Sequence, residues 1–220
     1  MRAMLLKLVS VNVGLPREVL WKGKHVLTGI FKEPVARRVL LRSLDLEGDQ
    51  QADLSVHGGA DKAVYVYPAE HYEYWRSELP GMQLPWGMFG ENFTTEGLLE
   101  TALHIGDRFR IGAAEVMVTQ PRLPCYKLGL KFGRDDIIKR FLHSGLTGFY
   151  LAVLQEGEVG AGDLFEPLGA NHNKVTVEDI TRLYLSNKDD AQLLQRAVQV
   201  EALPESWRRF FQHRLDKLVG

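Results

Sequence analysis

The chain contains a single cysteine, Cys125, among its 220 residues. One cysteine excludes an intrachain disulfide, an all-cysteine zinc site and a four-cysteine iron–sulfur cluster held by this chain alone. Histidine is too dispersed for a local zinc site, because none of the seven histidines forms an H-x-x-x-H pair. Any soft-metal chemistry of this chain therefore rests on one thiol.

The chain also lacks an excess of either charge and has no long apolar run. The formal net charge is −1, so no basic excess predicts a nucleic-acid surface. No run approaches the roughly 20 apolar residues of a membrane span. The N-terminal run MRAMLLKLVSVNVG contains Lys7 and lacks a small-residue cleavage site, so it predicts a first strand rather than a signal peptide. We therefore expect a soluble, cytoplasmic protein that contacts neither membrane nor nucleic acid.

Short apolar runs separated by glycine turns dominate the chain up to Leu168. The candidate strands are LLKLVSVNV, VARRVLL, AVYVYP, RFRI, AEVMVT and FYLAVL. Two helices are expected in this part, one in AEHYEYWRSEL, opened by Pro68, and one in RDDIIKRFLHSG, ended by Gly145. Many short strands and few helices favour a closed or partly closed β-barrel.

The segment after Asn171 has a different pattern, which predicts three short helices. Thr176 begins TVED, which resembles a capping box with Asp179 in place of the usual glutamate. DDAQLLQRAVQVEAL is helical by composition, and Pro204 opens PESWRRFFQHRLDKLVG, whose aromatic residues recur at helical spacing. Such helices are too small to fold alone, so we expect them to pack on the barrel or on a second copy of the chain. The predicted fold is mainly β with a helical tail (α+β): residues 1–168, then residues 169–220.

Cys125 lies in the stretch QPRLPCYKLGLKFG, where Pro121 and Pro124 stiffen the backbone and Arg122 and Lys127 supply positive charge. A thiol near cations ionises more readily, and the thiolate is the form that attacks electrophiles or binds soft metals. A lone cysteine is often just a small buried apolar residue. The flanking cations and prolines favour a functional role instead.

Two further stretches combine glycine with polar groups. His57, Gly58 and Gly59 are followed by Asp61 and Lys62, and a double glycine lets backbone amides approach a ligand closely. A plain turn with a chance histidine is the alternative.

The stretch FGENFTTEG places a carboxylate and an amide after Gly90, as Glu91 and Asn92, which is weak evidence by itself. Thr95 to Gly97 is expected to be only a turn.

Taken together, EGDQQADLSVHGGADKAVYVYP, FGENFTTEG and QPRLPCYKLGLKFG resemble, in this order, the MOSC domain, named after the C-terminal domain of molybdenum cofactor sulfurases. The three-helix tail resembles the YiiM type within that family. The resemblance implies a barrel-like β domain that holds a molybdenum–pterin cofactor. It also implies that Cys125 is the thiolate ligand of the molybdenum ion.

The resemblance further implies an activity, the reduction of N-hydroxylated compounds such as 6-hydroxylaminopurine to amines, as detoxification. His57 is then the candidate proton donor, because the pKa of free histidine lies near neutrality. The residues expected to bind the cofactor beside Cys125 are Arg122, Lys127, Gly58, Gly59, Lys62, Asn92 and, in WKGKH, Lys22.

The chain has too few cysteines for a fused iron–sulfur domain, so turnover is expected to need a separate electron-donor reductase, such as a flavoprotein. Two alternatives stay open. One is a carrier that binds the molybdenum cofactor or a sulfur species without turning it over. The other is a hydrolase or transferase with Cys125 as nucleophile and His57 as base, oriented by Asp61 or Asn92. A homodimer is also compatible with the sequence.

Overall fold

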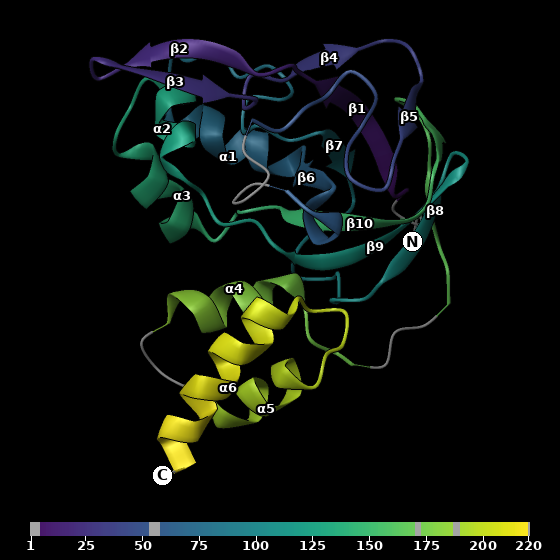
Figure 1. Ribbon diagram of the computed structural model, residues 1–220, viewed down its shortest axis with the longest axis vertical. Helices are drawn as coiled ribbons and strands as arrows, with labels where there is room; N and C mark the ends of the chain where they lie inside the picture. Colours follow the sequence, from purple (N-terminus) through teal and green to yellow (C-terminus); the bar gives the residue numbers. More distant parts are fainter. Residues whose placement is uncertain (1–4, 53–57, 170–172, 187–189, 220) are drawn as a thin grey trace.

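A large curved β-sheet with helices at its edge and a helical tail make up the fold, as Figure 1 shows. The computed structural model describes residues 5–52, 58–169, 173–186 and 190–219. The strands are β1 (Lys7–Val13), β2 (Arg17–Trp21), β3 (Lys24–Thr28), β4 (Glu33–Val35), β5 (Val39–Leu41), β6 (Val64–Pro68), β7 (Phe93–Glu96), β8 (Arg108–Ile111), β9 (Ala114–Pro121), β10 (Phe149–Gln155), β11 (Gly157–Val159) and β12 (Phe165–Pro167). The helices are the 3-10 helix η1 (Ala60–Lys62) and α1 (Glu70–Glu78), α2 (Tyr126–Phe132), α3 (Ile137–Ser144), α4 (Val177–Leu185), α5 (Ala191–Val198) and α6 (Glu205–Val219).

Eight strands form one mixed sheet in the order β12-β8-β9-β10-β6-β7-β1-β4. Only the β6–β7 pair is parallel, and the other neighbours are antiparallel. The sheet is curled, so that β12 at one end lies beside the β1 region near the other end: Phe165 N donates to Leu6 O at 2.8 Å, and Leu8 N donates to Asp163 O at 2.9 Å. The predicted β-rich domain with a helical tail is confirmed.

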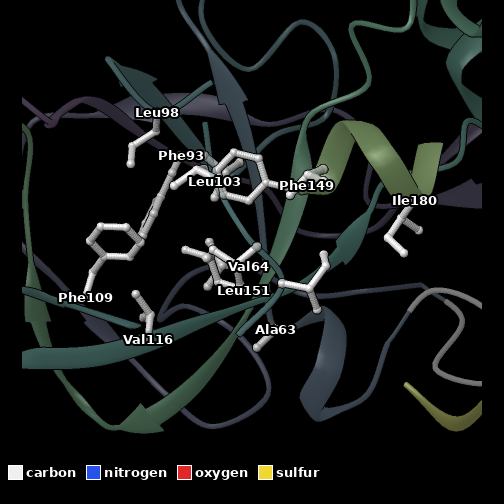
Figure 2. Close-up of a cluster of buried hydrophobic side chains, with 14 of the residues drawn as sticks. Ala63, Val64, Phe93, Leu98, Leu103, Phe109, Val116, Phe149, Leu151 and Ile180 are labelled. Atoms are coloured by element: carbon white, nitrogen blue, oxygen red, sulfur yellow. The ribbon is translucent and has the colours of Figure 1, made fainter. Parts of the chain in front are cut away.

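The inside of the curled sheet is filled by apolar side chains that alternate with outward-facing ones along each strand. Figure 2 shows Val64, Phe93, Val116 and Leu151 converging from four different strands. Ile180 of α4 belongs to the same cluster, so the tail shares the core of the sheet. Residues of one core cannot separate without exposing apolar area, which costs about 25 cal/mol per Å².

Both helices predicted within the sheet domain are confirmed. Tyr72, Trp75 and Leu79 lie on one face at the end of α1 and are at most 1% exposed. Gly145 ends α3 with a φ of 69°, the left-handed conformation that glycine adopts at low cost. Helix α2 was not predicted, because YKLGLKF is short and Gly129 interrupts it.

The polar strand β7 and the β2–β3 hairpin were also missed. Thr95 was expected in a turn, but it lies fully buried in β7, opposite Leu8 of β1. The expectation was wrong because β7 is a central strand, hydrogen-bonded along its two edges to β6 and β1, and Phe93, Thr94 and Thr95 are all buried there. The turn begins only at Gly97, which has a φ of 83°.

The tail lies against the outer side of β9. The capping box is confirmed, since Asp179 N donates to Thr176 Oγ1 at 3.0 Å and Thr176 N to Asp179 Oδ2 at 3.1 Å. The indole Nε1 of Trp207 donates to Gln120 Oε1 of β9 at 2.7 Å and ties α6 to the sheet. Within the described ranges, no helix is both long and apolar enough to cross a membrane.

Candidate functional site

A cavity opens where β9 leads through the cysteine stretch into α2. It has an empty volume of about 690 Å³, including the space open to solvent at its mouth. Five chain segments line it, around residues 28–32, 49–52, 62–65, 90–92 and 122–127, and Tyr150 of β10 completes the wall. Cys125 is half-buried in this wall, in extended backbone at the position before the first turn of α2.

The cavity wall carries four cations, Lys32, Lys62, Arg122 and Lys127. Arg122 is only 5% exposed, and its Nη1 atom has no hydrogen-bond partner among the described residues. Its guanidinium instead lies 5.1 Å from the ring centres of both Tyr65 and Phe141. Aromatic faces stabilise a cation only in part, and a buried charge without a counterion is costly. The cavity therefore fits an anionic ligand at Arg122.

Lys32 differs from Arg122 because its charge is already compensated. Its ammonium pairs with Asp49 at 2.5 Å from Oδ2, and the two side chains are 8% and 2% exposed. Asp49 also accepts hydrogen bonds from Gly14 N at 2.9 Å and Asn92 Nδ2 at 2.8 Å. This pair was missed by sequence reasoning. Asp49 stands in the motif EGDQQADLSVHGG and was findable there, whereas nothing around Lys32 marked it.

Asn92 lines the cavity, but its side chain is largely engaged with the protein. Its Oδ1 accepts from Tyr65 N at 3.1 Å, and its Nδ2 donates to Asp49 Oδ2 and, at 3.4 Å, to Asn12 O. Both amide hydrogens are thus used in joining β1, β6 and the Asp49 loop. Asn92 shapes the cavity wall, and one lone pair of Oδ1 remains for a ligand.

Glu91 points away from the cavity into the protein. It is fully buried and accepts hydrogen bonds from Gly87 N at 2.7 Å, Phe89 N at 3.0 Å and the Tyr72 hydroxyl. Burial raises the pKa of Glu91 above its ordinary value, and the Tyr72 hydrogen bond opposes that shift. Burial also lowers the pKa of the nearby Lys131 to about 8. Lys131 donates to Ile30 O at 2.9 Å, so this pair braces the loop that lines the cavity.

The structure brings together five of the predicted site residues, which are Cys125, Arg122, Lys127, Lys62 and Asn92. The others do not line this cavity or cannot be placed.

Gly58 and Gly59 are not among the lining residues, and Gly59 is exposed directly before η1. Lys22 lies at the tip of the β2–β3 hairpin, where it pairs with Asp135 at 2.7 Å and is 60% exposed. Ligand binding by these three residues stays a prediction. His57 lies outside the described residues.

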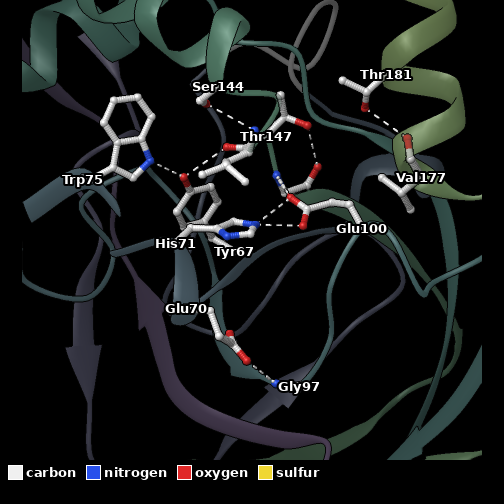
Figure 3. A network of polar contacts seen from close by, with 12 residues as sticks. Tyr67, Glu70, His71, Trp75, Gly97, Glu100, Ser144, Thr147, Val177 and Thr181 are labelled. Atoms are coloured by element: carbon white, nitrogen blue, oxygen red, sulfur yellow. Dashed lines mark hydrogen bonds and ion pairs between the residues drawn. The ribbon is translucent and has the colours of Figure 1, made fainter. Parts of the chain in front are cut away.

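A second buried polar cluster lies beside α1 (Figure 3). His71 Nε2 is 2.8 Å from Glu100 Oε2, and both residues are at most 7% exposed. Glu100 also accepts from Gly148 N at 2.7 Å. We call this the His71–Glu100 cluster; its buried charges are compensated within the protein.

A protein-only metal cage is not found in the described part of the chain. No group of three or more histidine, cysteine, aspartate or glutamate side chains lies close enough together to hold a metal ion. The described donor set is one thiol, Cys125, surrounded by cations. It suits a metal that brings its own anionic ligands and takes one ligand from the protein.

Comparison with known proteins gives consistent relatives. The family model of the MOSC domain matches residues 53–166, and that of the YiiM-like 3-alpha helix domain matches residues 175–218. The chain is 42% identical to the uncharacterized protein YflK of Bacillus subtilis, over 96% of this chain and 95% of YflK. It is 38% identical to protein YiiM of Escherichia coli, over 85% of this chain and 84% of YiiM.

Solved structures and a more distant relative extend the comparison. YiiM from Geobacillus stearothermophilus superposes with a TM-score of 0.80 at 34% identity, covering 96% of this chain and 99% of that one. A Gibberella moniliformis protein named reductase is 29% identical over 81% of this chain, which spans 32% of that protein. The predicted boundary near residue 168 falls between the two matched ranges, 53–166 and 175–218.

Proposed function

Because the chain belongs to the MOSC family and carries the three-helix domain of YiiM-like proteins, we propose that it is an oxidoreductase with a molybdenum–pterin cofactor that reduces N-hydroxylated compounds to amines. Membership of the family supports the association with this cofactor. The distant relative named reductase supports the class of reaction.

The single observation that carries the proposal is the buried guanidinium of Arg122 beside Cys125. Arg122 lines the same cavity as the thiol, and its buried Nη1 atom is without a partner among the described residues. A pterin cofactor of this kind brings phosphate and dithiolene groups, which are anionic and match such a cation. The residues present therefore fit the cofactor: Arg122 and Lys127 for its anionic groups, and the sulfur of Cys125 for the metal.

When bound, the cofactor supplies a centre that exchanges two electrons. The reaction R–NHOH + 2 e⁻ + 2 H⁺ gives R–NH₂ and water, so an external electron donor is required. The chain has one cysteine and cannot hold an iron–sulfur cluster by itself. We assign the electron supply to a separate reductase, such as a flavoprotein.

In this scheme the residues of the chain bind and orient the cofactor and the substrate. Burial raises the pKa of Tyr150, with Arg122 opposing, so the hydroxyl keeps its proton at neutral pH and serves as a hydrogen-bond donor beside Cys125. The Lys32–Asp49 pair fixes the opposite wall. His57 is the proposed source of the first proton.

The test is molybdenum content, measured on protein produced in a cofactor-competent host, beside a Cys125→Ser variant. We expect near-stoichiometric metal in the parent protein and strong depletion in the variant, because the ligand sulfur is gone. The loaded protein is then assayed with 6-hydroxylaminopurine and a low-potential chemical reductant. Equal metal in both proteins would remove the proposed role of Cys125. Metal retention without turnover would favour a cofactor carrier instead.

A further inference from the structure

Cys125 borders a second cavity as well as the first. This second cavity has an empty volume of about 950 Å³, including the space open to solvent, and lies between the cysteine stretch and the tail. Four residues line both cavities, Lys62, Leu123, Cys125 and Tyr150. The thiol is thus in the partition between a cation-lined compartment and a compartment whose far wall belongs to the helical tail.

The far wall is aromatic. Tyr184 of α4 and Trp207 and Phe210 of α6 line it, with ring centres 5.4 Å apart for Tyr184–Trp207 and 5.8 Å apart for Tyr184–Phe210. Trp207 is 8% exposed, whereas Tyr184 and Phe210 are 41% and 42% exposed. Exposed aromatic rings are unfavourable in water, so a wall of them beside a cavity indicates a ligand surface.

The wall is held rigidly against the sheet that carries the cysteine stretch. The hydrogen bond from Trp207 to Gln120 is buried, and Gln120 stands two residues before Arg122. Polar groups are few but present: the ammonium of Lys62 and the hydroxyl of Ser206 line the same space. A flat ring with acceptor nitrogens matches this combination of aromatic faces and donors.

We propose that this second cavity is the substrate compartment, and that Tyr184, Trp207 and Phe210 select flat, nucleobase-sized heteroaromatic compounds whose N–OH group faces Cys125. This inference rests on the proposed reductase function. It adds that the helical tail, not the sheet domain, determines which N-hydroxylated compounds are accepted. Small non-aromatic N-hydroxylated compounds would bind without this stacking.

The first experiment measures binding without turnover, by equilibrium dialysis of adenine, the amine product expected from 6-hydroxylaminopurine. The full-length protein is compared with the double variant Tyr184→Leu/Phe210→Leu, which keeps apolar volume but removes two ring faces. Tyr74→Leu is the matched control, because Tyr74 is 38% exposed and lines neither cavity. We expect adenine affinity to fall about tenfold or more in the double variant and to stay unchanged in the control. Thermal melting verifies that both variants are folded.

The second experiment measures the ratio of kcat/KM for 6-hydroxylaminopurine to that for hydroxyurea on cofactor-loaded protein. We expect the ratio to fall about tenfold in the double variant. No adenine binding by the parent protein, or equal binding by all three proteins, would overturn the substrate compartment. Reduction of both compounds with an unchanged ratio would also overturn it, and the proposed reductase function would stand. Aromatic-dependent adenine binding with no reduction of either compound would leave the compartment standing and remove the reductase function.

Discussion

Two buried polar clusters meet at one residue, Gly148, and differ in how completely they are paired. Gly148 N donates to Glu100 of the His71–Glu100 cluster at 2.7 Å, and Gly148 O accepts from Arg122 N at 3.1 Å. On the first side every buried charge has a partner in the protein. On the second side Arg122 lines a cavity, and its buried Nη1 atom has no partner among the residues that the structure describes.

The difference teaches how to distinguish scaffold from site in this molecule. When buried polar groups hydrogen-bond to each other, these bonds offset the free energy lost by removing the groups from water. A buried cation that lacks a charged partner in the fold is stabilised further when an anionic ligand binds. Our proposal of a cofactor site therefore rests on Arg122 and Cys125, whereas His71 and Glu100 are paired within the fold.

The largest expected effect comes from a change at Gly148, the residue that contacts both clusters. A Cβ on Gly148 would lie 2.3 Å from Val66 O, and the φ of 67° disfavours any side chain. We expect Gly148→Ala to lower the free energy of unfolding by more than about 3 kcal/mol, or to prevent folding. Gly145→Ala is the control, because Gly145 has a φ of 69° but open space around it, and should cost only about 1 kcal/mol. Urea unfolding measures both, and similar losses would contradict the crowding around Gly148.

Removing one partner of the His71–Glu100 cluster should give the next largest loss of stability. Glu100→Leu leaves the Gly148 amide and the His71 ring nitrogen without their acceptor. We expect a loss of about 2–4 kcal/mol, since each unsatisfied buried donor costs about 1–3 kcal/mol. Glu73→Leu is the surface control, with a side chain 81% exposed, and should change stability by less than about 0.5 kcal/mol. A Glu100→Leu protein as stable as this control would mean that the cluster is not structural.

The bracing pair behind the cavity adds a pH-dependent test. Burial lowers the pKa of Lys131 to about 8 in the folded protein, from an ordinary value of 10.5. Between these values the unfolded chain binds more protons, so stability rises with pH relative to a variant without the amine. Compared with Lys131→Met, the parent should gain at most about 3 kcal/mol from pH 8 to pH 10.5. The exposed Lys139→Met is the control, and a parallel pH profile for Lys131→Met and the parent would refute the shift.

The smallest expected change has the opposite sign. Arg122→Met removes an unpaired buried charge but keeps contact with the rings of Tyr65 and Phe141. We expect the cofactor-free protein to keep its stability or to gain about 1 kcal/mol, while molybdenum retention is lost. Differential scanning calorimetry and metal analysis measure the two effects. A loss of stability comparable to that of Glu100→Leu would place Arg122 among the scaffold residues.

Much of the fold could be predicted from local patterns. Alternating apolar runs located β1, β6, β8, β9 and β10, and the capping box at Thr176 marked the start of α4. The misses share a physical cause. β7 is polar in sequence but central in the sheet, with β6 and β1 along its edges and three of its four residues buried, and the β2–β3 hairpin is mostly exposed. α6 was expected to carry one apolar stripe, but Phe210 turned out 42% exposed.

The candidate site was predicted in part. The sequence shows which charged residues stand near Cys125, but it does not show which charged side chains form ion pairs in the fold. Arg122 and Lys127 stand beside the thiol in the chain, so they were found. The compensation of Lys32 by Asp49 and the second cavity depend on segments far apart in sequence. Glu91 and Asn92 are adjacent, yet one points inward and the other lines the cavity, which spacing alone does not reveal.

The position of the tail has a consequence for how such proteins diversify. The thiol and guanidinium come from the stretch after β9, whereas the aromatic wall opposite them comes from α4 and α6, more than fifty residues later. Under the proposed function, inherited changes in the tail alter which molecules are accepted while the residues around Cys125 stay the same. Homologues that share this sheet domain could then evolve toward new substrates through mutations confined to the last few dozen codons.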